Sequence, residues 1–281
     1  MPPESRMNSL SHPAAVPPTR ALLLGFGTVI LFISARPLFA GFGLAGNALV
    51  QWLFFFLPVV AGLTLGGYRL SESLGFRSVE PKVLVGGLML MLGALPLNGV
   101  VAWLQSFFLT VPDVVIEAMR AQFTAQSPLG WVGVILAAAV TPAVCEELVY
   151  RGLFLKPFRG KASGWVVIGL SSLAFGALHY MPQTGFRILP AAFSGAVIAW
   201  AVWHSGSIWT GMLMHLANNT LLLSLAAVST SVAIVSDDPS ATPSVLLTAV
   251  GLGLMIAGGR MILGANGPAP LTTENHSQEA T

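Results

Sequence analysis

The chain has 281 residues, of which 54% are hydrophobic and 9% are charged. Soluble domains carry about 25% charged residues, so this composition excludes an ordinary soluble protein and predicts a polytopic helical membrane protein. The formal net charge of +2 and the lack of a basic stripe argue against nucleic acid as a partner. The single cysteine, Cys145, excludes an internal disulfide and a CxxC metal or redox site.

Polar, proline-rich sequence lies at both ends of the chain. Residues 1–20 are predicted to form a disordered cytoplasmic tail, and residues 265–281 a disordered C-terminal tail. Between them, residues 21–264 are predicted to form a single transmembrane domain.

Eight apolar segments are long enough to be membrane spans, each of which needs about 20 mainly apolar residues. The predicted fold class is therefore an all-α polytopic membrane helical bundle of about eight transmembrane helices. Arg36 and Pro37 should kink or shorten the first of them. The predicted spans are roughly 21–42, 47–67, 83–109, 129–150, 164–181, 187–204, 207–229 and 243–263.

Two connections and the loop charges set the expected topology. Residues 68–82 form a polar connection at the membrane surface, and residues 111–128 have the pattern of a short amphipathic helix. With the N-terminus in the cytoplasm, ten Lys and Arg residues lie inside and three, Arg36, Arg120 and Arg187, lie outside. This bias predicts cytoplasmic termini, and the excess of arginine over lysine favours a bacterial plasma membrane.

Ionisable side chains are rare inside the predicted spans. Nine of the eleven acidic residues lie in tails or loops, and the other two are the adjacent Glu146 and Glu147. His179 and His215 also lie inside apolar segments, and Asn219 follows four residues after His215. Because a charged side chain at the bilayer centre costs about 2.5–3.5 kcal/mol on insertion scales, these residues are functional candidates.

Spacing separates the roles of the two glutamates. Glu147 and Arg151 are four residues apart, so they share a helix face and can form an ion pair, which is explained equally well as a structural contact. Glu146 is turned about 100° from Glu147. Its own helix offers it no basic partner one turn away, so a purely structural role explains it less well.

The two histidines lie on further helices at the same spacing. His215 shares a face with Asn219, and Phe175 shares one with His179. Taken singly, each histidine is well explained by a hydrogen bond in a protein core, and the asparagine by a contact between helices. Together with Glu146, the two histidines also offer enough ligands for zinc with one open position for water, although no HExxH sequence is present.

Three short motifs occur in order along these helices: EExxxR at 146–151, FxxxH at 175–179 and HxxxN at 215–219. In this order and spacing they resemble the CAAX protease and bacteriocin-processing family of intramembrane proteases, which includes the type II CAAX prenyl endopeptidases. Residues 205–219 (SGSIWTGMLMHLANN) are similar to the family's lead-in to its third motif. The resemblance covers about residues 129–222, which we interpret as the protease core.

The resemblance implies an intramembrane endopeptidase and a role for each motif residue. Glu146 is implied as the general base that activates a water, with His179 as a partner in holding it. His215 and Asn219 are implied as oxyanion stabilisers. The remaining motif residues are implied as structural support: Glu147, Arg151 and Phe175.

The predicted partners are the lipid bilayer and a hydrophobic, membrane-tethered or lipidated peptide substrate. The resemblance points to a glutamate-type enzyme, so no cofactor is favoured, and a metal-dependent enzyme with zinc on Glu146, His179 and His215 is the alternative. Two other functions compete with a protease. A non-catalytic scaffold or immunity protein would have no need to retain a costly unpaired glutamate, so the intact set of Glu146, His179, His215 and Asn219 argues against it. An ion-coupled transporter is disfavoured because the sequence shows no inverted repeat of broken helices.

The predicted topology places one geometric demand on the fold. Glu146 and His215 lie about 10–15 Å from the cytoplasmic boundary when each residue rises about 1.5 Å, whereas His179 lies about 22 Å from it. The helix that carries His179 must therefore tilt, or begin later than residue 164, if the three side chains are to meet.

Overall fold

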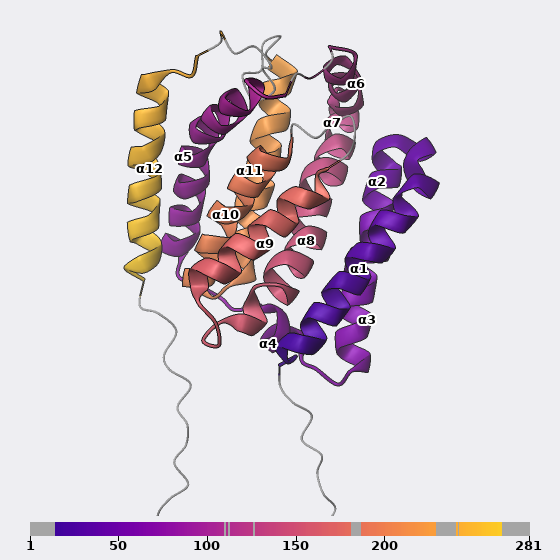
Figure 1. Cartoon of the computed structure of the whole chain (residues 1–281). Helices are drawn as coiled ribbons and strands as arrows, with labels where there is room; N and C mark the ends of the chain where they lie inside the picture. The colour runs from indigo at the N-terminus through magenta and orange to yellow at the C-terminus, as the bar shows by residue number, and fades with distance from the viewer. Residues whose placement is uncertain are drawn as a thin grey trace, which may run out of the picture.

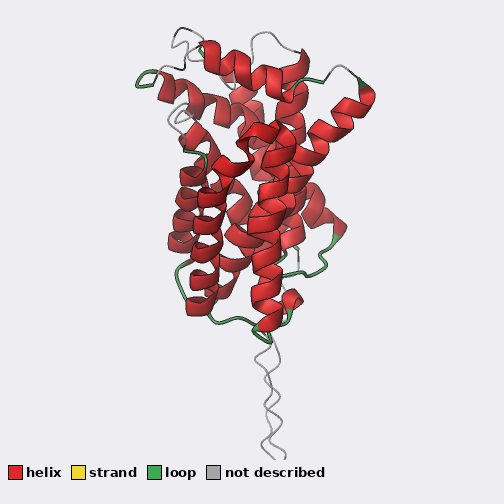
Figure 2. Ribbon diagram, turned by 90° about the vertical axis from the view of Figure 1, so that its right-hand side faces the viewer, coloured by secondary structure: helices red, strands yellow, loops and turns green. Residues whose placement is uncertain are grey.

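All regular structure in the described residues of the computed structural model is helical, which confirms the all-α bundle (Figures 1 and 2). The residues described are 15–109, 111, 113–125, 127–180, 187–228, 240 and 242–265. The helices are α1 (Pro18–Phe39), α2 (Gly43–Gln51), α3 (Leu57–Leu65), α4 (Leu70–Leu74), α5 (Pro81–Ser106), α6 (Asp113–Phe123), α7 (Pro128–Ile135), α8 (Thr141–Glu147), α9 (Gly164–Leu178), α10 (Ile188–Ser205), α11 (Ile208–Val228) and α12 (Val245–Leu263).

The first two predicted spans form a helical hairpin. α1 continues past Pro37 and ends at Phe39. Gly43, whose φ of 56° favours glycine, begins α2. The chain then returns beside α1 through a π-helical turn and α3 (Figure 1). The rings of Phe32 and Phe55 stack across the hairpin with their centroids 4.2 Å apart. The interruption expected at Pro37 is therefore the end of a helix just beyond it.

Five helical runs among the described residues are long and apolar enough to cross a membrane, against the eight spans predicted. The first run holds both arms of the hairpin, and so contains two predicted spans. α9 has only 15 residues. α11 has 21 residues and is not among the five. The five runs are Pro18–Leu65, Pro81–Ser106, Pro128–Phe158, Ile188–Ser205 and Val245–Leu263.

α5 and α12 pack backbone against backbone at two pairs of glycines. A Cβ atom on Gly86 would lie 2.8 Å from the carbonyl oxygen of Gly258, and one on Gly93 would lie 2.4 Å from that of Gly251. Small residues allow helices to approach this closely in membrane proteins. The contact attaches α12 to the side of the bundle opposite α1 (Figure 1).

The segments that connect the helices at the two ends of the bundle lie where the sequence predicts them. α4 lies within the polar connection 68–82, and α6 occupies the segment predicted as an amphipathic helix. α1 begins and α12 ends at the same end of the bundle, the lower end in Figure 1, as an even number of crossings requires.

α9 is tilted, as it must be if His179 is to meet Glu146 and His215. It begins at Gly164, where the apolar segment begins, and it crosses the bundle obliquely while α12 runs almost upright (Figure 1). Because α9 is short and inclined, its C-terminal end lies within the bundle, where His179 follows its last residue.

Candidate active site

α8 carries the two adjacent glutamates and is bounded on both sides by π-helical turns, Leu136–Val140 and Leu148–Leu153. Such turns are rare and occur frequently at functional sites, because the extra residue changes the direction of the side chains that follow. Arg151 lies in the second of them. The EExxxR part of the predicted site therefore lies on the least regular part of the helical run Pro128–Phe158.

Pro142 explains how α11 is attached to this run. In an α-helix the N–H of residue 142 would donate to the carbonyl oxygen of Ala138, but proline has no N–H. Asn219 Nδ2 donates to that carbonyl at 3.1 Å, and Asn219 Oδ1 accepts a hydrogen bond from Asn218 Nδ2 at 3.1 Å. The structure thus places Asn219 on the backbone of the glutamate-bearing run, with one amide N–H outside these two contacts.

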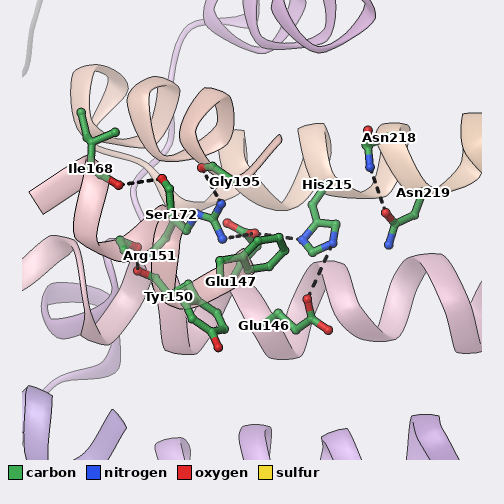
Figure 3. A network of polar contacts seen from close by, with 12 residues as sticks. Glu146, Glu147, Tyr150, Arg151, Ile168, Ser172, Gly195, His215, Asn218 and Asn219 are labelled. Carbon is green, nitrogen blue, oxygen red and sulfur yellow. Dashed lines mark hydrogen bonds and ion pairs between the residues drawn. The ribbon is translucent and has the colours of Figure 1, made fainter. Parts of the chain in front are cut away.

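Glu147 lies at the centre of a buried polar network (Figure 3). Its Oε1 atom lies 3.0 Å from Arg151 Nη1 and 2.9 Å from His215 Nδ1. Arg151 Nη2 also donates to the carbonyl oxygen of Gly195 at 2.9 Å, and the guanidinium lies over the ring of Phe175 at 4.8 Å. The spacing predicts the contact between Glu147 and Arg151, but it does not predict the contact with His215.

Glu146 faces the other side of the same imidazole. Its Oε2 atom lies 4.0 Å from His215 Nε2, and the residue is 7% exposed. This oxygen makes no hydrogen bond to any of the residues that the structure describes. The two ring nitrogens of His215 therefore lie between the two glutamates, one in direct contact with Glu147 and the other facing Glu146 (Figure 3).

Phe175 lies against both histidines. Its ring centroid is 4.9 Å from that of His179 and 5.7 Å from that of His215. His179 Nδ1 lies 2.9 Å from the carbonyl oxygen of Phe175, one helical turn earlier. The FxxxH spacing thus lets one aromatic ring pack against both imidazoles and against the Arg151 guanidinium.

Two glycines take part in the site without any signal in the sequence. Gly195 supplies the carbonyl that Arg151 contacts, and a Cβ on it would lie 2.9 Å from Phe175 Cδ1. A Cβ on Gly211 would lie 2.6 Å from Glu147 Oε2. Both positions bring a neighbouring helix close to the network, which a single sequence cannot show.

Gly211→Ala should lower kcat/KM for peptide hydrolysis by about 100-fold, because displacing Glu147 also displaces His215. Gly169→Ala is the matched control, since a Cβ there meets no atom within 4 Å and alanine favours the helix at both positions. Initial rates for the two variants test this expectation. Equal rates would show that the network tolerates the added methyl group.

The described residues do not assemble the alternative zinc site. No three His, Cys, Asp or Glu side chains among them gather in an arrangement that could hold a metal ion. His215 has Nδ1 on Glu147, and its Nε2 is 4.0 Å from Glu146 Oε2. Zinc on Glu146, His179 and His215 stays a prediction, tested below with a chelator.

Residues 128–221 match the family described as type II CAAX prenyl endopeptidase Rce1-like. The match covers about a third of the chain and includes the EExxxR, FxxxH and HxxxN motifs. Comparisons with curated proteins and with solved structures found no match. The family match and the apolar helices support an intramembrane endopeptidase within an integral membrane protein. Residues 128–221 of this chain are therefore similar to the Rce1-like type II CAAX prenyl endopeptidases.

Proposed function

We propose that this chain is a glutamate-type intramembrane endopeptidase that hydrolyses a peptide bond in a hydrophobic, membrane-tethered or lipidated peptide. The placement of Glu146 carries this proposal. Its buried carboxylate faces an imidazole across 4.0 Å, and a second carboxylate holds the other side of that imidazole. A buried carboxyl group of this kind is costly to the fold, and a scaffold would gain nothing from it.

The contact with Glu147 determines what His215 can do. Nδ1 donates its hydrogen to Glu147 Oε1, so Nε2 of a neutral His215 carries a lone pair towards Glu146. Arg151 offsets the charge of Glu147, so a single proton can be shared between Glu146 and His215. When Glu146 is the carboxylate, His215 is an imidazolium with Nε2–H available as a donor.

This state supplies both functions that amide hydrolysis needs. Glu146 accepts a proton from a water, and the resulting hydroxide attacks the carbonyl carbon of the scissile bond. His215 Nε2–H and the remaining N–H of Asn219 donate to the oxyanion. When the intermediate collapses, the C–N bond breaks and the proton on Glu146 passes to the leaving amine, so one water is consumed.

His179 fits the role of holding the water. Its Nδ1 donates to the carbonyl oxygen of Phe175, so the neutral imidazole presents Nε2 as an acceptor. An acceptor on the water's second hydrogen would keep its oxygen lone pair directed at the substrate. We place the enzyme in a bacterial plasma membrane with both termini in the cytoplasm, in keeping with the loop charges.

Cleavage of a peptide library by the purified protein tests the proposal. The library carries apolar or lipidated C-termini, and mass spectrometry reads the products. We expect fragment pairs whose masses add up to the peptide plus one water, with and without EDTA. Loss of cleavage in EDTA and its recovery with zinc would replace the glutamate-type mechanism by the metal alternative. A folded protein that cleaves no member would support the non-catalytic scaffold.

A further inference from the structure

The segment that follows α4 is attached to the start of α11. The backbone N–H of Ile208 donates to the carbonyl oxygen of Gly75 at 3.0 Å, and Ser207 Oγ donates to the carbonyl oxygen of Arg77. Gly75 has a φ of 79°, a backbone conformation that favours glycine. α4 lies at the lower end of the bundle, where α1 begins and α12 ends (Figure 1). These contacts therefore hold Arg77 at that end of the molecule.

The end of the glutamate-bearing run brings two more basic side chains to the same place. Arg159 Nη2 donates to the carbonyl oxygen of His204 at 3.3 Å, and a Cβ on Gly206 would collide with the Arg159 guanidinium. A Cβ on Gly75 would lie 3.3 Å from Lys156 Cε and 3.5 Å from the carbonyl oxygen of Gly206. Lys156 and Arg159 thus contact neighbouring parts of one small stretch of backbone.

Positive charge exceeds negative charge at this end of the bundle. We call four side chains the basic cluster: Arg77, Lys156, Arg159 and Lys161. Glu72, on α4, offsets one of their charges, whereas Glu80 pairs with Lys82 at 3.0 Å. Among the described residues, no carboxylate lies within ion-pair distance of the four cations. Burial and the positive charge of Arg77 both lower the pKa of Arg159, so an anion bound here would be stabilised.

Aromatic side chains border the basic cluster. Trp209 is 50% exposed and packs against Phe76, with the ring centroids 5.2 Å apart. Trp165, on α9, is 74% exposed and follows four residues after Lys161. Exposed tryptophans of membrane proteins are enriched at the level of the lipid headgroups, so cations beside them face headgroup phosphates. The border therefore favours a lipid headgroup over a soluble anion.

We propose that the basic cluster binds the headgroup phosphate of an anionic phospholipid. Arginine binds phosphate through paired hydrogen bonds and lysine binds it as a point charge, and basic pockets between membrane helices bind anionic headgroups. The bound phosphate ties the end of the glutamate-bearing run to the connection between α10 and α11. It thereby stabilises the packing of the helices that carry Glu147 and His215. This binding does not depend on whether the chain cleaves peptides.

Thermal unfolding of the full chain in a neutral detergent tests the site. We expect phosphatidylglycerol to raise the unfolding temperature by about 2–5 °C, and to bind about 10-fold more tightly than phosphatidylcholine in native mass spectrometry. Inorganic phosphate and a soluble acidic peptide should each leave the unfolding temperature unchanged. A shift of the same size with either of them would show that the cluster binds a soluble anion. Equal binding of the two lipids would show that the headgroup charge is not recognised.

Substitutions assign the lipid binding to the cluster. Arg77→Gln and Lys156→Gln should each weaken the binding of phosphatidylglycerol about fivefold, and the double variant about 25-fold. Each variant is measured with and without lipid, so that a change in its own stability is separated from the loss of binding. Arg260→Gln is the control, because Arg260 is an exposed arginine in the last turn of α12, at the same end of the bundle. An equal loss in Arg260→Gln, or none in the double variant, would overturn the proposal.

Discussion

Glu146→Gln should lower kcat/KM for peptide hydrolysis by about 10²- to 10⁴-fold while the protein stays folded. Glutamine has nearly the shape of glutamate and can occupy the same buried space, but its amide cannot accept a proton from water. Among the described residues, Oε2 of Glu146 makes no hydrogen bond, so the substitution breaks no hydrogen bond of that oxygen. Stability in detergent should therefore stay at or above that of the wild type.

Initial cleavage rates and thermal unfolding of the same preparations check this expectation. Glu117→Gln is the control, because Glu117 is an exposed acidic residue on α6 and lies outside the matched domain. It should match the wild type in both measurements. Wild-type rates in Glu146→Gln would remove Glu146 as the base and with it the proposed mechanism. A low rate accompanied by a lower unfolding temperature would point to misfolding, and the comparison would then be repeated with Glu146→Asp.

Hydropathy and the spacing of residues along single helices were enough to predict the helices and the ion pair within one of them. Long apolar runs must be helical in a bilayer, so α5 and α12 coincide with predicted segments to within a few residues. The four-residue spacing of Glu147 and Arg151 leads directly to an ion pair on one helix. Each of these inferences needs only residues that are neighbours along one helix.

Contacts between helices could not be predicted in the same way. Glu147 and His215 are 68 positions apart, and their hydrogen bond depends on how closely α8 and α11 pack, which Gly211 permits. The tilt of α9 likewise depends on how this helix packs against its neighbours.

Arg151→Met should lower the free energy of unfolding by about 3–5 kcal/mol, because it leaves the Glu147 carboxylate buried with a single partner, His215. Methionine fills much of the same volume, so the effect reports charge more than packing. Denaturation in detergent micelles measures the change. Arg260→Met is the control, since its side chain is exposed and removing its charge should leave the unfolding transition unchanged.

The double variant Glu147→Gln with Arg151→Met distinguishes the contribution of this ion pair to stability from the contribution of Glu147 to catalysis. Removing both charges should recover most of the lost stability, since no unpartnered charge is left in the pair. Activity should stay low, because His215 then lacks the carboxylate that holds its Nδ1 atom in place. If the double variant is as unstable as Arg151→Met, the contacts of the guanidinium with Gly195 and Phe175 provide the stability instead. If the double variant regains full activity, Glu147 is a structural partner of Arg151 and His215 works without it.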